Sequence, residues 1–216
     1  MPREPLKSKT ERTERTLGIL KEEFPEVGCS LNFETPLQLL LATILSAQCT
    51  DERVNIVTKE LFREYRSAAD FAAAPLADIE KMVRSTGFYR NKAKSIKSCC
   101  EALVVRHGGE VPDTMEELTP LAGVGRKTAN VVLGNAFGKE EGVVVDTHVR
   151  RICNLLGLTR QDDPVRIEND LVNIVPRNYW TLFSHLMIRH GRRTCVARRP
   201  DCQACSIADF CPSEKP

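Results

Sequence analysis

The sequence predicts an all-α protein of about ten short helices. Its apolar residues recur at helical spacing, as in the segments 37–45 and 96–104, where they follow the i, i+3, i+4, i+7, i+8 pattern of an amphipathic helix. Strand patterns are nearly absent, because the only run of β-branched residues, at 143–145, is too short to build a sheet. These observations favour helix-on-helix packing over any sheet-based architecture.

Local signals set the ends of the two strongest helices. Thr35 and Pro36 provide an N-cap and a first-turn proline ahead of residues 37–45, and the Gly108-Gly109 pair stops the helix of residues 96–104. The first dozen residues are charged, so we expect them to be disordered. Helical patterns also predict elements near 12–24, 51–66, 76–85, 114–119, 126–137, 147–156, 165–174 and 177–190.

The composition is that of a soluble globular protein. Of the 216 residues, 42% are hydrophobic and 28% are charged, which excludes the collagen-like, disordered and membrane classes. The longest apolar stretch, residues 37–45, is shorter than the roughly 20 residues that a membrane-spanning helix needs. No apolar secretory signal is visible near the N-terminus, so we expect a cytoplasmic protein with no membrane partner.

Basic residues cluster in two segments, although the net charge is only +2, from 31 basic and 29 acidic residues. Residues 81–106 contain seven Lys or Arg and one acid, and residues 189–199 contain five Arg, one His and no acid. Two basic segments on a near-neutral chain indicate a protein with one side that faces nucleic acid. The alternative is that both segments are solvated helix faces.

Residues 118–132 read as a helix, a tight glycine turn and a second helix. The segment is not a P-loop, because no Gly-Lys pair follows a four-residue spacer. It is not a full dinucleotide-binding fingerprint either, because Thr128 stands where the third glycine belongs and no strand precedes it. Gly123 and Gly125 leave backbone amides uncovered, and these amides and the next helix N-terminus form an anion site that suits a phosphate. Residues 114–137 therefore resemble the helix-hairpin-helix motif that binds the DNA backbone. The alternative is a plain turn between two helices.

Lys127 is a candidate nucleophile. It lies in the first turn of a predicted helix, where the helix macrodipole disfavours positive charge, and it directly follows Arg126. Both features favour the neutral amine, which is the form that attacks carbon and makes Schiff bases. The alternative is that Lys127 pairs with a DNA phosphate, as we expect of Arg126.

Asp146 is a candidate carboxylate for the same chemistry. It follows three valines and precedes a predicted helix, so its approach is apolar. An aspartate at this position is a good N-cap. Paired with Lys127, it could also accept the lysine proton or stabilise positive charge growing on a sugar ring. The structural and chemical roles are compatible.

The nine cysteines divide into two sets. Five are scattered among apolar neighbours and are expected to be small core residues, namely Cys29, Cys49, Cys99, Cys100 and Cys153. The other four lie in one short segment, at Cys195, Cys202, Cys205 and Cys211. An odd total without an export signal argues against a disulfide framework.

The spacing of the four C-terminal cysteines is Cys-x6-Cys-x2-Cys-x5-Cys, which contains one close pair where structural zinc sites usually have two. This spacing favours a [4Fe-4S] cluster over zinc. Arg198 and Arg199 lie in the six-residue interval, where a cluster would present them to phosphate. The alternative is that both arginines are only solvated loop residues.

With these elements in order, the sequence closely resembles the endonuclease III family of helix-hairpin-helix DNA glycosylases. The matching motifs are Leu45–Asp51, Gly87-Phe88-Tyr89, the glycine hairpin with Lys127, Val145–His148 and the four-cysteine segment. The resemblance extends over about residues 12–212. The combination of motifs is highly specific, although no single motif is.

The resemblance implies two helical domains with duplex DNA bound in the groove between them. Residues 29–140 would form a six-helix barrel, and residues 1–28 and 141–216 would form an iron–sulfur domain from both chain ends. Residues 138–142, where two glycines flank three charged residues, are the best candidate for the crossing between the domains. Lys127 and Asp146 would face each other, one from each domain.

The resemblance also implies that Gln48 and Phe88 fill the space left by a flipped nucleotide. Phe88 stands where the family usually has leucine, and Ala122 stands where it usually has proline, so the preference for the opposite base is in question. Without the resemblance, Phe88 would read as a core aromatic residue and Gln48 as a polar residue at a helix end.

The chemistry implied is covalent base excision by a monomeric enzyme. The substrates would be oxidised pyrimidines and abasic sites in double-stranded DNA, and the target nucleotide must be flipped out of the duplex. Neutral Lys127 would displace the base from the sugar, and β-elimination from the resulting Schiff base would break the strand on the 3′ side. Asp146 would stabilise the cationic sugar and handle the lysine proton.

Three other functions remain as alternatives. The related adenine glycosylase has the cluster but needs an acid in the helix before Gln48, and residues 37–47 contain none. A monofunctional mismatch glycosylase is disfavoured because Lys127 is present. The alternative from another class is a non-catalytic DNA-binding module with a zinc-stabilised tail, which would be colourless and inert on abasic DNA.

Overall fold

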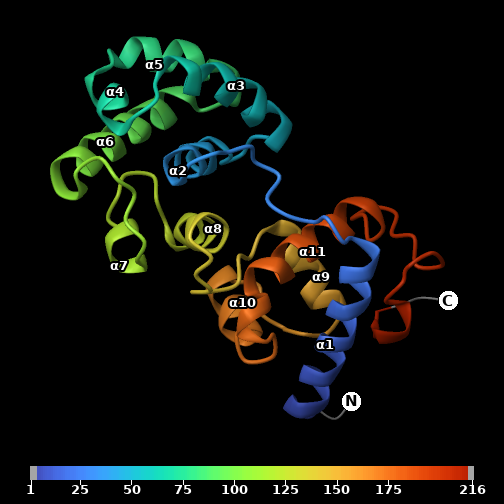
Figure 1. Ribbon diagram of the computed structural model, residues 1–216. Coiled ribbons are helices and arrows are strands. Elements are labelled where there is room, and N and C mark those ends of the chain that lie inside the picture. The colour runs from blue at the N-terminus through green and yellow to red at the C-terminus, as the bar shows by residue number, and fades with distance from the viewer. Residues whose placement is uncertain (1–3, 214–216) are drawn as a thin grey trace. The chain divides into compact units, whose positions relative to one another are not determined.

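The computed structural model describes residues 4–213, and this part of the chain contains eleven α-helices, three short 3-10 helices and no strand, which confirms the all-α prediction. The chain divides into two compact units (Figure 1). The central unit is Cys29–Glu141, and the terminal unit combines Met1–Gly28 with Gly142–Pro216. The change of unit after Glu141 falls within the glycine-flanked segment 138–142. No helix in the described residues is both long and apolar enough to span a membrane.

The central unit is built around a helix that is apolar on most of its surface. This helix, α2, packs against α3, α6 and α8, and six of its ten residues are buried (Figure 1). Such a helix is stable only inside a protein, so its neighbours form a shell around it. The elements of the unit are α2 (Pro36–Leu45), α3 (Asp51–Glu64), α4 (Ala68–Ala73), α5 (Leu76–Val83), η1 (Arg84–Thr86), α6 (Tyr89–His107), α7 (Met115–Leu118) and α8 (Arg126–Ala136).

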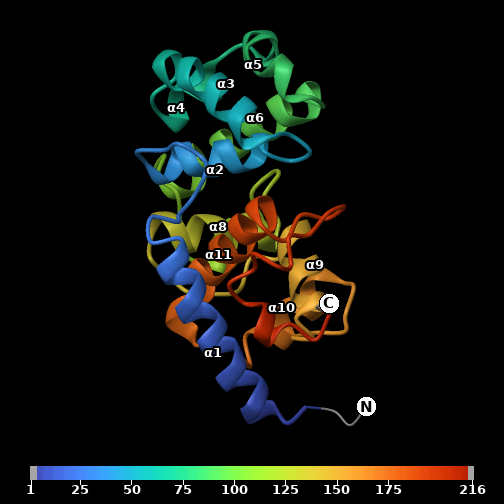
Figure 2. The same ribbon diagram turned by 90° about the vertical axis from the view of Figure 1, so that its right-hand side faces the viewer.

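The terminal unit joins a helix from the start of the chain to helices from its second half. Its elements are α1 (Leu6–Glu23), α9 (Thr147–Leu155), α10 (Pro164–Leu171), η2 (Arg177–Tyr179), α11 (Trp180–Arg193) and η3 (Ala208–Phe210). Figure 2 shows α1 running beside α11, against which it packs. Leu17 and Leu20 carry the buried face of α1 into the core of this unit.

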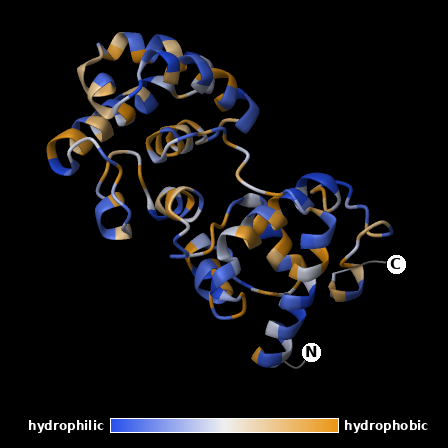
Figure 3. Ribbon diagram, in the orientation of Figure 1, coloured by the Kyte–Doolittle hydropathy of each residue, from blue (hydrophilic) through white to orange (hydrophobic). Residues whose placement is uncertain are grey.

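A glycine in α11 lies close to side chains of α9. A Cβ atom on Gly191 would lie 2.8 Å from both His148 Nδ1 and Ile152 Cδ1, so a larger residue would have to displace these side chains. Apolar residues gather along α9 and α11 where they pack together (Figure 3). Gly191 therefore leaves room for α9 side chains where the two helices pack.

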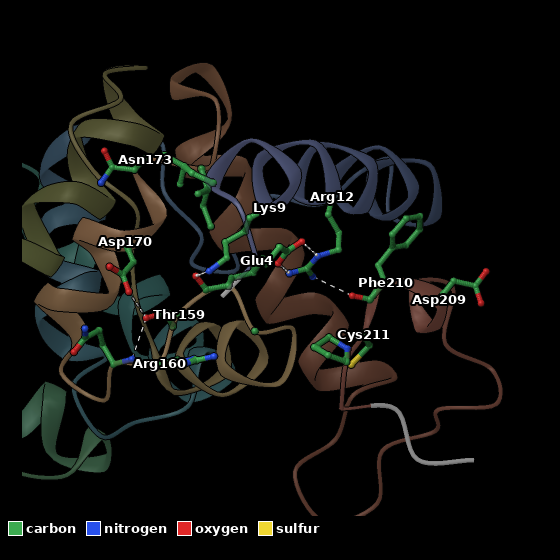
Figure 4. Close-up of a pocket in the computed structure, with 16 residues that line it drawn as sticks. Glu4, Lys9, Arg12, Thr159, Arg160, Asp170, Asn173, Asp209, Phe210 and Cys211 are labelled. Carbon is green, nitrogen blue, oxygen red and sulfur yellow. Dashed lines mark hydrogen bonds and ion pairs between the residues drawn. The ribbon is translucent and has the colours of Figure 1, made fainter. Parts of the chain in front are cut away.

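The N-terminal segment is helical where the sequence analysis expected disorder. Helix α1 begins at Leu6, so the expectation is wrong for residues 6–12, and residues 1–3 lie outside the described residues. Arg12 explains the order: it pairs with Glu4 at 2.8 Å and donates a hydrogen bond to the carbonyl oxygen of Phe210 (Figure 4). Arg12 also donates a hydrogen bond to the carbonyl oxygen of Leu156. These tertiary contacts fix a segment that its composition alone leaves open.

Two further differences concern the central unit. Helix α4 was not predicted, although Ser67 and Asp70 form a reciprocal capping box at its start. The helix predicted around residues 96–104 begins earlier, at Tyr89, directly after a left-handed residue at Phe88. The other predicted helices occur with ends shifted by a few residues, which is the usual uncertainty of helix boundaries.

Candidate functional site

The glycine turn before α8 has the conformation that the sequence predicts. Gly123 has φ +78, and a Cβ atom there would lie 3.0 Å from the Ser95 Cβ, so both the backbone and the space require glycine. Gly125 is the N-cap of α8, and no side chain caps that helix. Because both glycines are exposed, the first amides of α8 are open to an anion such as a phosphate.

Lys127 lies in the first turn of α8, directly after this turn, and its side chain is exposed. Among the described residues, no side chain or carbonyl pairs with the Lys127 amine, so the lysine is not part of a structural ion pair. Arg126 precedes it and is also exposed. The turn therefore presents an accessible amine next to a potential phosphate site.

Asp146 is the N-cap of α9, as one of the two predicted roles requires. Its Oδ1 accepts a hydrogen bond from the Val149 backbone amide at 2.8 Å. The three preceding valines are buried, and Asp146 itself is half-buried. The second oxygen, Oδ2, accepts no hydrogen bond from the described residues, so capping occupies only part of the carboxylate.

Gln48 and Phe88 share an unusual backbone conformation. They are the only residues other than glycine with positive φ in the described part of the chain, at φ 52 and φ 47. Left-handed backbone is costly for such residues and concentrates at functional sites. Both side chains are exposed, and Phe88 is 65% exposed, so the alternative that Phe88 is a core aromatic residue is wrong.

The four C-terminal cysteines line a single cavity in the terminal unit. Its walls also include Ile152, Leu155 and His190. Cys195, Cys205 and Cys211 pack against the core of the unit. The scattered cysteines behave differently: Cys99, Cys100 and Cys153 are buried, and burial raises the pKa of Cys99 to about 12, which leaves an unreactive thiol. Cys29 and Cys49 are half-buried.

The cavity has the donor set of an iron–sulfur cluster, because four cysteine sulfurs line it. Arg151 Nη1 lies 3.5 Å from Cys195 Sγ, and His190 Nε2 lies 3.7 Å from Cys205 Sγ. Nitrogen groups beside the sulfurs suit thiolates that ligate an iron–sulfur cluster.

Arg198 and Arg199 are exposed on the loop between the first two cysteines of this set. A backbone hydrogen bond of 3.0 Å from Asp201 N to Thr194 O closes that loop. The arginine side chains therefore point away from the core. This placement is compatible with both predicted roles, phosphate binding and simple solvation.

The basic segment 81–106 contains two lysines that sequence reasoning placed on the surface and that the structure buries fully or in part. Lys92 is buried, and Lys97 is half-buried. Each ammonium group donates hydrogen bonds to two backbone carbonyls. Charge counting could not distinguish these structural lysines from lysines that face DNA.

Comparisons with known proteins place this geometry in a family. Residues 41–177 match the model of the HhH-GPD superfamily base excision DNA repair protein, and residues 195–211 match the iron–sulfur binding domain of endonuclease III. Endonuclease III from Synechocystis sp. is 53% identical over 206 residues, which cover 95% of this chain and 94% of that protein.

Two solved structures of endonuclease III with DNA share the fold, each with a TM-score of 0.89 and 42% sequence identity. One is a non-covalent complex that covers 94% of this chain and 95% of the other chain. The second, a trapped covalent intermediate described as an estranged-adenine complex, covers 94% and 96%. The chain thus belongs to the endonuclease III family of the HhH-GPD superfamily, as a base-excision-repair DNA glycosylase and AP lyase with an iron–sulfur cluster.

Proposed function

We propose that this protein removes oxidised pyrimidines from double-stranded DNA and cleaves the strand at abasic sites through a Schiff base on Lys127. The observation that carries the proposal is the exposed Lys127 amine in the first turn of α8, beside amides that no side chain caps. The trapped covalent endonuclease III intermediate supports it, because a covalent DNA adduct requires a nucleophile on the protein.

The reaction begins with extrusion of the target nucleotide, since its sugar is out of reach inside a duplex. The Lys127 nitrogen then attacks C1′, the bond from C1′ to the base breaks, and the base leaves with a proton. The C1′–O4′ bond of the sugar then breaks as O4′ takes a proton, which opens the ring and leaves a protonated imine between Lys127 and C1′. This imine acidifies the C2′ hydrogen. Loss of that proton expels the 3′ phosphate by breaking the C3′–O bond.

Asp146 would accept the Lys127 proton and stabilise the positive charge that develops on the sugar. The N-cap bond from Val149 N holds Oδ1, which fixes the carboxylate and leaves Oδ2 for this work. The half-buried position strengthens its electrostatic effect relative to water. Positioning and charge stabilisation would therefore come from one side chain.

Gln48 and Phe88 would occupy the space that the extruded nucleotide leaves, with the amide of Gln48 meeting the opposite base and the Phe88 ring stacking in the gap. Their exposed, left-handed positions support this role. The exposed backbone at Gly123 and Gly125 would bind a DNA phosphate, helped by Arg126.

The terminal cysteines would hold a [4Fe-4S] cluster through Cys195, Cys202, Cys205 and Cys211, which all line one cavity. When bound, the cluster supplies the cross-links that order a segment with little helix of its own. Arg198 and Arg199 would then present two charges to the DNA backbone. We infer that the protein acts as a monomer in the bacterial cytosol.

The test is borohydride trapping on a duplex with an abasic site. Lys127→Gln should abolish trapping, base release and strand cleavage, because one amine performs these steps. Duplex binding should stay within about a few-fold of the unmodified protein, because the phosphate grip comes from backbone amides and several arginines.

Lys59→Gln is the matched control, because Lys59 is an exposed lysine of α3 in the same unit and lies outside the basic segment 81–106. It should trap normally. Trapping that persists in Lys127→Gln would overturn the assignment. A colourless protein that contains zinc and is inert on abasic DNA would favour the non-catalytic module instead.

A further inference from the structure

One buried lysine connects the bases of the two loops that carry Gln48 and Phe88. Lys92 is 5% exposed, and its ammonium group donates hydrogen bonds to Leu45 O at 2.9 Å and to Thr86 O at 2.7 Å. Leu45 is the last residue of α2, and Thr86 is the last residue of η1. The same side chain therefore reaches the starts of both loops.

The two carbonyl groups lie close in sequence to the exposed left-handed residues. Gln48 follows Leu45 by three positions, and Phe88 follows Thr86 by two. The Leu45 carbonyl, at a helix C-terminus, lacks a partner within its helix and carries the negative end of the helix dipole. An ammonium group at this position can donate a hydrogen bond to the Leu45 carbonyl oxygen and place a positive charge beside the negative end of the helix.

Lys92 is itself held against the second loop by its main chain. Its backbone amide donates a hydrogen bond to Phe88 O at 3.2 Å, in the first turn of α6. Burial lowers the pKa of the Lys92 amine, so the charged form is retained at a cost and needs its carbonyl partners. Hydrogen bonds to two carbonyl groups therefore restrict the Lys92 side chain more than the packing of α6 alone would.

We propose that Lys92 is a positioning residue that sets the placement of Gln48 relative to Phe88, so that both side chains enter the duplex together when a nucleotide is extruded. The inference rests on the proposed function of those two residues. Costly left-handed backbone persists only where the surroundings determine it. The Lys92 ammonium group is bonded to the starts of both loops, so the position of one loop depends on the position of the other.

Lys97 provides a matched comparison on the same helix. Its ammonium group also donates to two backbone carbonyls, those of Ala72 and Ala74, at the end of α4. Lys97 is half-buried and also pairs with Glu101 at 3.5 Å, and its carbonyl partners belong to a segment that carries neither Gln48 nor Phe88. Lys97→Met should therefore report the structural cost of losing such a lysine, without the loss of loop placement.

The experiment uses the full-length, iron-loaded protein and a duplex with 2-aminopurine opposite a tetrahydrofuran abasic analogue, so that unstacking of the opposite base is read as fluorescence. A second duplex with a natural abasic site gives the single-turnover rate of borohydride trapping. Lys92→Met should lower that rate at saturating enzyme by about 10- to 100-fold and reduce the fluorescence rise. Its affinity for undamaged duplex should change by less than about threefold, since the phosphate contacts remain.

The Gln48→Ala/Phe88→Ala variant completes the design. Adding Lys92→Met to it should cause little further loss of rate or fluorescence, because residues that act through one another are not additive. Lys97→Met should lower the melting temperature as Lys92→Met does and leave trapping and fluorescence unchanged. If Lys92→Met fails to fold, Lys92→Arg keeps the charge and donors with a different reach, and it should show an intermediate loss.

Two outcomes overturn the inference by itself. One is equal behaviour of the Lys92 and Lys97 variants, and the other is a full additional loss when Lys92→Met is added to the double variant. If Gln48→Ala/Phe88→Ala instead leaves fluorescence and trapping unchanged, the proposed roles of Gln48 and Phe88 are wrong, and the inference about Lys92 falls with them.

Discussion

The two units hold their functional side chains in different ways. In the central unit, Gln48 and Phe88 lie on turns whose ends are fixed by helices and by hydrogen bonds to backbone groups, and Lys127 lies in the first turn of α8. In the terminal unit, the four cysteines lie after α11, in a segment whose only described helix is the single turn η3. Polypeptide alone can therefore define the first set of positions, whereas the second set depends on an inorganic cross-link.

The largest effect is expected from removing one ligand of the cluster, which tests whether the terminal segment depends on the cluster for its order. Cys205→Ser should give insoluble or poorly folded protein with little iron, because the terminal segment loses the cross-link that orders it. Iron content per chain and the circular dichroism melting curve measure the effect. The unmodified protein should be yellow-brown and contain about four iron atoms per chain.

Cys153→Ala is the control for that variant, because Cys153 is a buried core cysteine of the same unit. It should retain full iron content and lose only about 1 kcal/mol of unfolding free energy, the cost of a small cavity. Equal loss of iron in both variants would mean that the terminal unit depends on its core as much as on its cluster.

The next largest effect should come from Asp146→Asn, which separates the two roles of this residue. Turnover should fall by about 10²-fold or more, the scale expected for loss of a positioned acid–base group. Stability should be nearly unchanged, because asparagine is also a good N-cap. Single-turnover kinetics and chemical denaturation measure the two quantities.

Asp146→Ala sharpens this test, since alanine cannot cap α9. It should lose the same activity and about 1 kcal/mol of unfolding free energy in addition. If Asp146→Asn retained full activity, the carboxylate would serve only as an N-cap.

The smallest effect should come from Arg198→Ala/Arg199→Ala, which probes the loop that the cluster orders. Each lost phosphate contact should reduce the slope of log K against log salt by about 0.9, so the pair should reduce it by up to about two. Damaged and undamaged duplexes should be affected about equally, because phosphate contacts carry no sequence information. Salt titrations of binding to both duplexes measure the slopes.

Iron content and single-turnover chemistry at saturating enzyme should remain unchanged in that double variant. An unaltered salt slope with full iron content would show that both arginines are only solvated. Loss of iron together with binding would show that the loop serves the cluster instead of the DNA.

Periodicity predicted most of the fold, because the buried faces of α2 and α6 follow from the spacing of their apolar residues, including Cys99 and Cys100 in α6. It failed at the start of α1, where order comes from Arg12 reaching carbonyls more than 140 residues away. Contacts of that range leave no local signal. Helix α4 did leave a local signal, the capping box formed by Ser67 and Asp70, but the helix has only six residues and was not predicted.

The candidate site was predictable where its chemistry requires particular residue types. Glycines at 123 and 125, a lysine after them and four close cysteines restrict the possible functions severely. The left-handed backbone at Gln48 and Phe88 left no such signal, since neither residue type favours it. The buried position of Lys92 was also hidden, because a lysine in a basic segment reads as surface charge.

The discontinuous terminal unit has a consequence for how the protein is made. Domains tend to fold as they leave the ribosome, and the contiguous residues of the central unit can do so. Helix α1 is synthesised before the central unit, whereas its partner α11 and the Phe210 carbonyl that binds Arg12 are synthesised after it. The nascent chain must therefore carry the apolar face of α1, with Leu17 and Leu20, without its native partners while the whole central unit is made.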